Sequence, residues 1–407
     1  MKILYFHQHF STPSGSVGTR SYEMAQRLIA AGHQVTIVCG SYANGTTGIS
    51  APFKGSSRKG IVDGINIIEF DLSYGNKDGF VKRGFTFLNF AMRSVMVALR
   101  EPCDIVFATT TPLTAGIAGI FAKGLRRKPF VFEVRDLWPE LPRAMKVITN
   151  PILLWTMGAL EWASYKSADR LIGLSPGIVD GISRYVDRDT IELIPNGCDI
   201  NLFAGDIAPW RPKQVSSDDF MAVFTGTHGK ANGLNAIIDA AIILKERKAG
   251  NIKFLLIGDG SEKAALMKRA DDKGLNDIVI FHDPIAKTKL SGLMASADVG
   301  LQILANIPAF YYGTSPNKFF DYLAAGLPVL TNYPGWVADM IKDNDCGMAV
   351  QPDNALAFAD ALIAMQNSSR KKDMAHNAHA LAKREFSRDK LGEKFVKWVI
   401  GASEAKP

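Results

Sequence analysis

Short apolar runs alternate with amphipathic stretches along the first half of the chain. The series begins with an apolar run at Lys2–Phe6 and a helical pattern over residues 21–31, which ends at Gly32. Further strands are expected at residues 35–39, 65–70, 105–108, 130–134, 171–174 and 192–194. Since continuous apolar runs separated by helices are typical of buried parallel strands, the pattern predicts a parallel sheet with helices on both faces.

The same alternation restarts in the second half. Strands are expected at residues 221–225, 253–257, 278–281, 299–304, 328–331 and 348–350, and a helix at residues 234–248. A polar segment at 206–219 contains Pro209 and Pro212 and reads as the linker between two domains. We therefore predict an α/β protein of two doubly wound Rossmann-like domains that face each other across a cleft. Their ligands are expected at the carboxyl ends of the strands.

Composition supports two folded domains and an anionic partner. The 407 residues are 47% hydrophobic and 21% charged, and the net charge is +7. Residues 1–200 hold 22 basic against 17 acidic side chains, so the excess lies mainly in the first half. Phosphate, nucleic acid and an acidic membrane face all suit such an excess. No recognised nucleic-acid-binding module occurs, which argues against nucleic acid.

Metal, disulfide and secretion signals are weak. The four cysteines form no CxxC pair and are expected to be reduced and buried. Two acidic pairs, Asp187/Asp189 and Asp343/Asp345, lie in polar turn-like segments and read as solvated charges; with no HExxH sequence, we expect no metal site. No secretory signal precedes the first strand, so a cytoplasmic protein is expected.

Glycine-rich loops follow the first strand of each predicted domain. In the first loop Gly15, Ser16 and Gly18 precede a helix, and Arg20 could add donors to a bound phosphate. The second loop contains Gly226, Thr227, His228, Lys230 and Asn232, with donors suited to a pyrophosphate. Gly258 and Pro284 follow later strands and complete this predicted donor site. An ordinary turn after a strand remains the alternative for each loop.

A short helix after residue 315 is a third candidate for anion binding. Ser315 is expected as its N-cap and Pro316 as its first residue, and Gly326 ends it. The helix N-terminus with Asn317 and Lys318 could bind a diphosphate, and Asp321 could accept hydrogen bonds from a ribose. A capped surface helix with a Lys/Asp pair is the alternative.

Charged residues also follow the apolar strand at Phe130–Val134. Glu133 or Asp136 could act as a base toward an acceptor hydroxyl. A salt-bridged loop with Trp138 in the core explains the same residues equally well. Residues 80–99 combine aromatic and basic side chains, so this helix either lies on an anionic bilayer or packs on the first sheet.

Together these segments resemble the retaining glycosyltransferases of family four, which have the two-Rossmann GT-B fold. The resemblance covers nearly the whole chain and includes residues 13–20, 28–38, 133–140, 168–176, 194–199, 226–234, 257–260 and 315–328. Within the family the chain is similar to O-antigen and capsule enzymes of the WbuB type, the N-acetyl-L-fucosamine transferases. The resemblance implies an N-terminal acceptor domain at 1–203, a nucleotide-sugar domain at 204–388 and a terminal helix at 389–407 that returns to the first domain.

The resemblance also assigns roles to individual residues. It places Gly15 and Ser16 at the donor pyrophosphate and Asp321 at the ribose. Gly313 occupies the position of the family's first acid, for which Ser315 and Asn317 are possible substitutes. Thr227 and Asn232 stand where many relatives have Arg and Lys, so Lys230 and Lys318 are candidates for the missing charge. Asp136 lies near the position of a family histidine.

The implied activity is transfer of a sugar from a nucleotide-sugar donor, UDP-linked, without a metal ion or other cofactor. The implied acceptor is a saccharide on a polyprenyl pyrophosphate, and the implied location is the inner face of the cytoplasmic membrane. Two alternatives remain. One is a nucleotide-sugar epimerase of the same fold, and the other is a non-catalytic, membrane-associated assembly protein.

Overall fold

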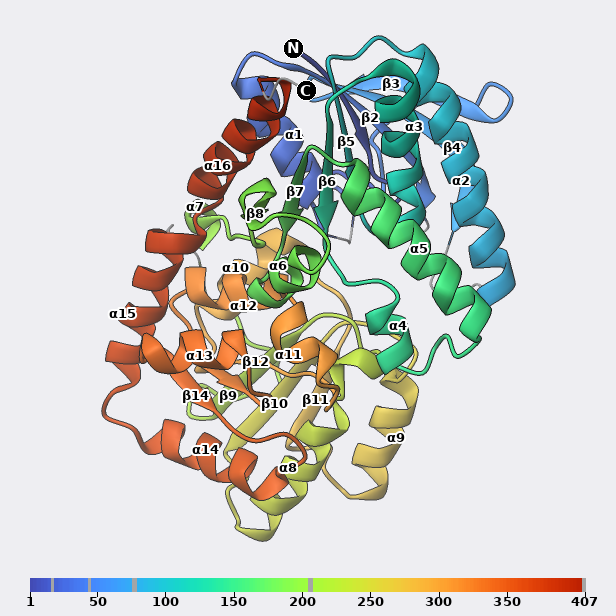
Figure 1. The fold of residues 1–407 in the computed structure, drawn as a ribbon. Coiled ribbons are helices and arrows are strands. Elements are labelled where there is room, and N and C mark those ends of the chain that lie inside the picture. Colours follow the sequence, from blue (N-terminus) through green and yellow to red (C-terminus); the bar gives the residue numbers. More distant parts are fainter. Residues whose placement is uncertain (16–17, 43–44, 75–78, 204–207, 405–407) are drawn as a thin grey trace. The chain divides into compact units, whose positions relative to one another are not determined.

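The computed structural model describes residues 1–15, 18–42, 45–74, 79–203 and 208–404. Ser16 therefore lies outside the described residues. The chain forms two compact units, each an α/β sandwich (Figure 1). The first unit contains Met1–Pro195, Gly313–Ser315 and Asp389–Pro407, and the second contains Asn196–Tyr312 and Pro316–Arg388.

The first unit is built on an eight-stranded sheet in the order β3-β4-β2-β1-β5-β6-β7-β8. Every neighbouring pair is parallel except β3 and β4, which are antiparallel. The strands are β1 (Lys2–Phe6), β2 (Gln34–Tyr42), β3 (Ser57–Val62), β4 (Ile65–Tyr74), β5 (Ile105–Thr109), β6 (Phe130–Val134), β7 (Arg170–Gly173) and β8 (Ile191–Leu193).

Helices cover both faces of this sheet. Figure 1 shows α2, α3 and α5 along one face and α1 and α16 along the other. The helices of eight or more residues are α1 (Arg20–Ala30), α2 (Phe80–Arg100), α3 (Gly116–Arg126), α5 (Pro151–Ser167), α6 (Pro176–Ser183) and α16 (Arg388–Ile400). The short helix α4 (Glu140–Ala144) follows β6.

The second unit has a six-stranded sheet in the order β11-β10-β9-β12-β13-β14, and its neighbouring strands are parallel. Its strands are β9 (Phe220–Thr225), β10 (Ile252–Ile257), β11 (Val279–His282), β12 (Val299–Gln302), β13 (Val329–Thr331) and β14 (Gly347–Ala349). Its helices are α7 (Ile200–Phe203), α8 (Asn235–Glu246), α9 (Lys263–Asp272), α10 (Lys287–Met294), α11 (Ala309–Gly313), α12 (Asn317–Ala324), α13 (Trp336–Asp343), α14 (Ala355–Asn367) and α15 (Lys371–Leu381).

The predicted class of two Rossmann-like domains is confirmed, and the expected strands appear within a few residues of their predicted bounds. One strand was not predicted. β3 pairs with β4 at the edge of the sheet, and none of its residues is buried, which agrees with the lack of an apolar run in its sequence SRKGIV. The first stretch of the first unit ends at Pro195. This is earlier than the polar segment at 206–219 that was predicted to separate the domains.

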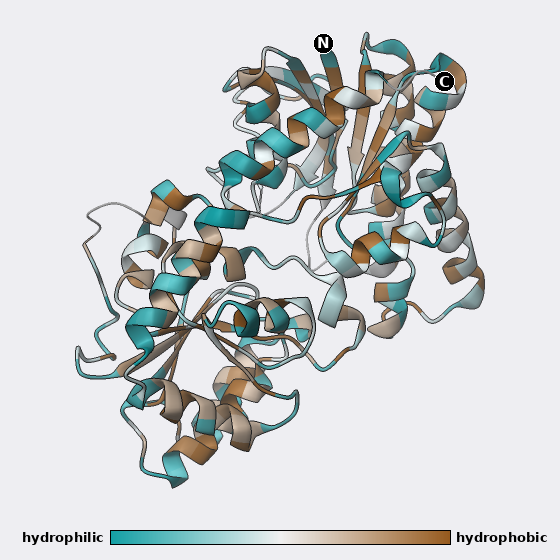
Figure 2. Cartoon of the chain, turned by 60° about the vertical axis from the view of Figure 1, so that its left-hand side comes forward, coloured by the Kyte–Doolittle hydropathy of each residue, from teal (hydrophilic) through white to brown (hydrophobic). Residues whose placement is uncertain are grey.

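Each unit has its own apolar core. The strands of both sheets are strongly hydrophobic, and polar residues lie on the outer faces of the helices (Figure 2). In the first unit the central strands β1, β5 and β6 are almost wholly buried, as are β9 and β10 in the second. Burial on both faces explains the continuous apolar runs in the sequence.

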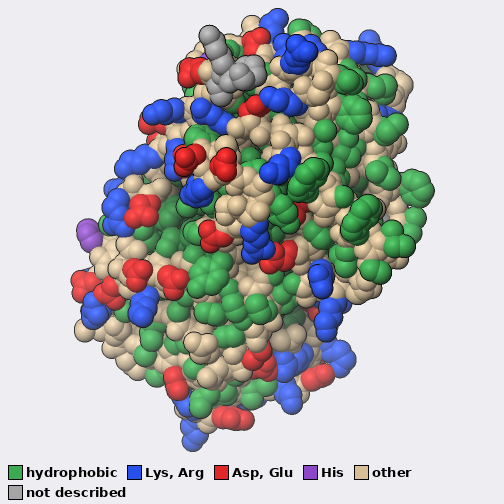
Figure 3. Space-filling model, in the orientation of Figure 1, with side chains coloured by type: hydrophobic (Ala, Val, Ile, Leu, Met, Phe, Trp, Pro, Cys, Tyr) green, Lys and Arg blue, Asp and Glu red, His purple; other side chains and the backbone are tan. Residues whose placement is uncertain are grey.

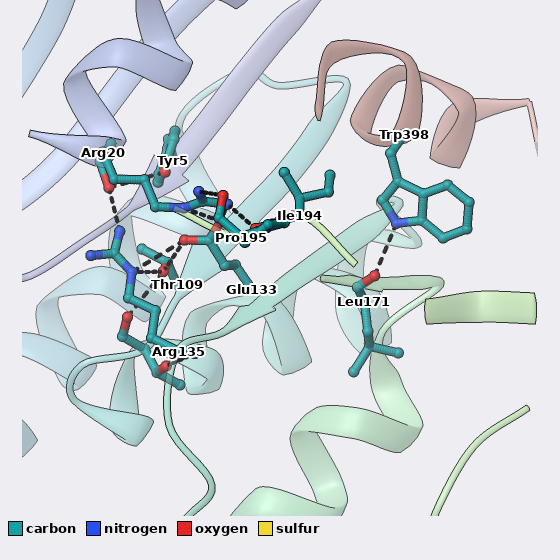
Figure 4. A network of polar contacts seen from close by, with 11 residues as sticks. Tyr5, Arg20, Thr109, Glu133, Arg135, Leu171, Ile194, Pro195 and Trp398 are labelled. Atoms are coloured by element: carbon teal, nitrogen blue, oxygen red, sulfur yellow. Dashed lines mark hydrogen bonds and ion pairs between the residues drawn. The ribbon is translucent and has the colours of Figure 1, made fainter. Parts of the chain in front are cut away.

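The last helix, α16, belongs to the core of the first unit. Phe395 is fully buried, and its ring centroid lies 5.2 Å from that of Phe107 on β5. The indole of Trp398 donates a hydrogen bond to the carbonyl oxygen of Leu171 at 3.0 Å (Figure 4). The guanidinium of Arg170 lies 4.5 Å from the Trp398 ring centroid. The C-terminal segment thus completes a domain that begins at residue 1.

Candidate functional site

The two loops that follow β9 and β10 touch through their glycines. A Cβ atom on Gly258 would lie 1.8 Å from the carbonyl oxygen of Gly226, and one on Gly260 would lie 2.4 Å from that of His228. Gly226 and Gly258 also have positive φ angles of 141° and 151°. Only glycine allows both the backbone angles and the close approach. The contact fixes the two loops at the carboxyl ends of neighbouring strands, where doubly wound folds bind ligands.

The ammonium group of Lys318, on α12, lies beside these loops. Its Nζ is 3.7 Å from the centroid of the Phe224 ring and donates a hydrogen bond to Asn232 Oδ1 at 3.2 Å. A Cβ atom on Gly226 would lie 3.0 Å from Nζ, so a larger residue there would displace the ammonium. Burial lowers the pKa of Lys318 from 10.5 to about 7. An anion bound beside Lys318 would favour its charged form.

The remaining predicted residues of this loop are more exposed. Thr227 and Lys230 are exposed, and Lys230–Asn232 forms a 3-10 turn. Asn232 Nδ2 donates to the carbonyl oxygen of Thr227 at 2.7 Å, so the side chain of Asn232 joins the loop to Lys318. These contacts bring Gly226, Thr227, Asn232 and Lys318 together. Pro284 is exposed after β11.

His228 does not fit the role of a phosphate donor. Its side chain is fully buried, and neither ring nitrogen has a hydrogen-bond partner among the described residues. Burial, followed by the nearby charges of Lys263 and Lys318, lowers the pKa of His228 to about 4. A neutral imidazole with no exposed surface cannot reach a ligand in this conformation. The prediction of His228 as a phosphate donor is therefore wrong for this structure, in which its ring lies near the rings of Phe224 and Phe281.

Helix α12 is fixed to the sheet through Tyr322. Its hydroxyl accepts from the backbone nitrogen of Thr225 at 3.1 Å and donates to the carbonyl oxygen of Val223 at 3.2 Å. The helix begins one residue later than predicted, because Pro316 is its N-cap, and no side chain caps it. Ser315 therefore does not serve as N-cap. Asn317 is exposed and Asp321 partly exposed on this helix.

In the first unit, Glu133 forms a buried ion-pair network (Figure 4). Its Oε2 accepts from Arg20 Nε and Nη2 at 3.0 and 2.8 Å. Its Oε1 accepts from Thr109 Oγ1 at 2.8 Å and from Arg135 Nε at 3.2 Å. Arg20 also donates to the carbonyl oxygens of Ile194 and Pro195 at 2.9 and 2.8 Å. The network joins β5, β6 and α1 to the end of β8.

These contacts change the predicted roles of Glu133 and Arg20. Burial by itself raises the pKa of Glu133, but Arg20 and Arg135 outweigh it and hold the pKa below its usual value. A carboxylate with this many donors is a poor base. The guanidinium of Arg20 is used inside the domain rather than on a phosphate. We therefore reassign both residues from the substrate site to the stabilisation of the carboxyl ends of β5 and β6.

The pKa of Asp136 is shifted in the opposite direction from that of Glu133. It is only partly exposed, and burial raises its pKa despite the neighbouring Arg135 and a hydrogen bond from Thr111. A raised pKa suits a carboxyl group that exchanges a proton with a hydroxyl. Of the two predicted bases, Asp136 is the one whose surroundings remain compatible with that role.

The first glycine loop is shaped by contacts within the loop region. A Cβ atom on Gly15 would lie 2.2 Å from Ser11 Oγ and 3.2 Å from the backbone nitrogen of Thr46. Thr12 in turn donates from its backbone nitrogen to the carbonyl oxygen of Thr46 at 2.8 Å. Close packing therefore explains Gly15 without a ligand. Gly18 is exposed.

Three neighbouring helices of the first unit carry exposed apolar side chains. On α2, Val81, Phe85 and Met92 are 70, 71 and 70% exposed. Leu125 on α3 and Trp155 on α5 are also exposed, and Figure 3 shows hydrophobic side chains along the side where α2 and α5 lie. The sequences of α2 and α3 contain basic residues and no acidic ones. Within the described residues, no helix is long and apolar enough to span a bilayer.

Several important residues gave no usable signal in the sequence. Phe224 and Tyr322 lie in apolar runs typical of any core, and only the structure places them against Lys318 and β9. Across the described part of the chain, no group of three acidic, histidine or cysteine side chains is arranged to hold a metal ion.

Two family models match consecutive parts of the chain. Residues 15–197 match "Glycosyl transferase 4-like domain", and residues 206–381 match "Glycosyl transferases group 1". Among curated relatives, the D-inositol 3-phosphate glycosyltransferase of Arthrobacter sp. strain FB24 is 26% identical over 54% of this chain and 52% of its own length. The lipopolysaccharide core biosynthesis glycosyltransferase LpsE of Rhizobium meliloti is 25% identical over 57% of this chain and 64% of its own. The chain thus spans only about half the length of the first of these relatives.

Solved structures match over nearly the full length. Sucrose-phosphate synthase from Thermosynechococcus elongatus has a TM-score of 0.76 at 16% identity and covers both chains completely. Anabaena HepE, solved with UDP-glucose, has a TM-score of 0.66 at 16% identity over 98% of each chain. At these identities the likeness shows the fold alone.

Proposed function

We propose that this chain transfers a sugar from a UDP-sugar to a lipid-linked saccharide, because glycosyltransferase family models match residues 15–197 and 206–381. Transfer proceeds with retention of the anomeric configuration, and the nucleoside diphosphate leaves. The observation that carries the proposal is the ammonium of Lys318, held beside the glycine loops at the ends of β9 and β10.

This arrangement suits stabilisation of a leaving diphosphate. A preorganised cation in a partly dehydrated site interacts more strongly with developing charge than it would in water. Gly226 and Gly258 allow a phosphate to approach the backbone closely. Lys230 is exposed on the same loop and can supply a second charge. Lys318 therefore takes the role that the resemblance assigns to a lysine at the position of Asn232.

The choice of UDP and of a lipid-linked acceptor follows the names of similar proteins. HepE was solved with UDP-glucose, and LpsE is named for lipopolysaccharide core biosynthesis. The alpha-monoglucosyldiacylglycerol synthase of Streptococcus pneumoniae, 22% identical over 79% of this chain, is named for a glycolipid. The finer proposal, N-acetyl-L-fucosamine transfer in O-antigen or capsule synthesis, rests on the sequence resemblance. It selects which donor to test first.

We place the protein at an anionic membrane surface through the exposed apolar face of α2, α3 and α5. On α2 and α3 the exposed apolar side chains share the helix with Lys and Arg but with no acidic residue, which matches the chemistry of a bilayer interface. Binding to vesicles that contain phosphatidylglycerol should fall when Phe85 and Met92 are replaced by serine. Vesicle binding that is unchanged in this double variant would contradict the placement.

The first test is calorimetry with UDP, GDP and ADP, in the presence of EDTA. Selective binding of UDP is expected. EDTA should not weaken it, because we propose that neither binding nor turnover needs a metal ion. The UDP-linked donors are then screened with lipid-linked acceptors. Failure of a folded protein to bind any of the three nucleotides would contradict the proposal, and an altered free sugar nucleotide without acceptor would indicate an epimerase.

A further inference from the structure

Two cavities lie next to each other in the first unit, between the segment after β6 and the helices α5 and α6. The first has a volume of about 350 Å³ and the second about 560 Å³. Pro139 and Arg143 line both cavities, so these two residues lie at their junction. Both volumes fall within the range of about 300–1,000 Å³ that small-molecule sites occupy.

The first cavity has polar and aromatic walls. Trp138, Glu140, Glu161, Arg184 and Tyr185 line it. The indole nitrogen of Trp138 is buried and has no hydrogen-bond partner among the described residues. Glu161 is 5% exposed and accepts from the backbone nitrogen of Trp138 at 3.0 Å and from the Tyr165 hydroxyl at 2.8 Å. Aromatic rings beside carboxyl and guanidinium groups are suited to bind the hydroxyl groups of a sugar.

The second cavity is mainly apolar. Ile148, Pro151, Leu154 and Trp155 form its walls, and Arg143 is its only charged lining residue. Trp155 is 72% exposed, and the neighbouring Val147 and Ile152 are also exposed. The cavity therefore opens beside the apolar face that we place on the membrane. A hydrocarbon chain that enters this cavity would contact mainly apolar side chains and would end beside Arg143.

The apolar cavity, Arg143 and the polar cavity follow one another in this order. We infer that the two cavities bind the lipid-diphosphate end of the acceptor. The isoprenoid lies in the second cavity, its diphosphate pairs with Arg143, and the first sugar lies in the first cavity beside Trp138 and Glu161. This inference rests on the proposed function, because it assumes a lipid-linked acceptor. Of the residues that line the two cavities, only those at 137–140 belong to a sequence motif described above, and none belongs to the donor site.

The charges around the two cavities favour an anion at their junction. Arg184 is paired with Glu140 at 3.5 Å, whereas Arg143 forms no ion pair among the described residues. Burial raises the pKa of Glu161 to about 7, so this carboxyl group is partly protonated at neutral pH. In its protonated form it adds no negative charge and can donate a hydrogen bond. Arg143 is thus the cation best placed to meet a diphosphate.

The test is calorimetry with geranyl diphosphate, kept below its micellar concentration, and with inorganic pyrophosphate. We expect the wild-type protein to bind geranyl diphosphate at least tenfold more tightly than pyrophosphate. Arg143→Gln should weaken geranyl diphosphate binding at least tenfold. Trp155→Ala should weaken the binding of geranyl diphosphate much more than the binding of pyrophosphate. The control Arg100→Gln, an exposed arginine that lines neither cavity, should bind as the wild type does.

Competition with UDP separates this site from the donor site. Saturating UDP should leave geranyl diphosphate binding unchanged, and Lys318→Met should lose UDP but keep geranyl diphosphate. Displacement of geranyl diphosphate by UDP would overturn the inference, as would equal affinities in the wild type and Arg143→Gln. If UDP binds and geranyl diphosphate does not, the inferred site fails while the proposed function stands. If only geranyl diphosphate binds, the donor proposal fails instead.

Discussion

Replacing Lys318 by methionine separates the charge of this residue from its packing. Methionine keeps an unbranched side chain over Phe224 but removes the ammonium and its hydrogen bond to Asn232. A charged hydrogen bond to a phosphate contributes about 1.5–3 kcal/mol, so UDP affinity should fall roughly 10- to 150-fold. Uridine, which lacks phosphate, should lose far less.

The same substitution should not weaken the fold. The pKa of Lys318 falls from 10.5 to about 7, and at 1.36 kcal/mol per unit this corresponds to roughly 5 kcal/mol of lost interaction for the charged form. Because Lys318 is partly exposed and half neutral at pH 7, we expect Lys318→Met to recover a smaller amount, about 2 kcal/mol. Thermal unfolding of the variant should therefore occur at an equal or higher temperature.

The pH dependence gives an independent reading of the same group. Below pH 7 the free protein already carries the proton that a diphosphate favours, and above pH 7 binding must take it up. The affinity for UDP should therefore fall as pH rises, by about tenfold between pH 6 and pH 8. Titration of UDP itself affects both proteins, so the difference between the wild type and Lys318→Met isolates the lysine.

Calorimetry with UDP and uridine at pH 6, 7 and 8 tests these expectations, with Lys245→Met as the matched control. Lys245, on α8, donates to the carbonyl oxygens of Lys273 and Gly274 and is not one of the predicted donor-binding residues. The reasoning is refuted if Lys318→Met loses no more UDP affinity than this control. Equal losses for UDP and uridine would also refute it.

Four further changes test other parts of the structure. Glu133→Gln should destabilise the first unit by about 3 kcal/mol in urea unfolding, because Arg20 and Arg135 lose their buried counter-charge; a stability equal to that of the wild type would argue against the network. Since burial lowers the pKa of His228 to about 4, the unfolded chain binds more protons below pH 6.5, and His228 should account for about 2 kcal/mol of stability lost between pH 7 and pH 5. Between pH 7 and pH 5, His228→Phe should lose about 2 kcal/mol less stability than the wild type. An unchanged dependence of stability on pH would contradict the burial of a neutral His228. Asp321→Ala should weaken UDP binding several-fold in calorimetry, whereas unchanged affinity would remove Asp321 from the donor site. Trp398→Ala should lower the stability of the first unit by about 3 kcal/mol, because it removes the bond to Leu171 and the contact with Arg170; thermal unfolding at the wild-type temperature would count against α16 as part of the core.

Most of the fold follows from the spacing of apolar residues, because both sheets are buried on both faces. Strand β3 was missed because it lies at an edge and has no buried residue, so its pairing depends on its antiparallel neighbour rather than on an apolar run. The cap of α12 was also misassigned. Ser315 has the residue type of an N-cap, but the backbone turns into the helix only after Pro316.

The candidate site was less accessible from sequence, because residue type does not reveal burial or partners. His228 and Lys318 both looked like phosphate donors, yet one is fully enclosed and the other lies over Phe224. Glu133 and Asp136 are three residues apart and differ in their surroundings, since Glu133 forms ion pairs with two arginines. The cavities beside Arg143 depend on α4, α5 and α6 coming together, which no local motif predicts.

The first unit includes α16, so its chain is not contiguous, and this has a consequence for synthesis. When a ribosome has released residues 1–195, the buried surface that Phe395 and Trp398 cover is still open. The second unit emerges and can fold before that surface closes. The N-terminal stretch of the first unit must therefore wait, incomplete, until α16 (Arg388–Ile400) has been translated. A nascent chain stalled before α16 should be a better chaperone client than the released protein.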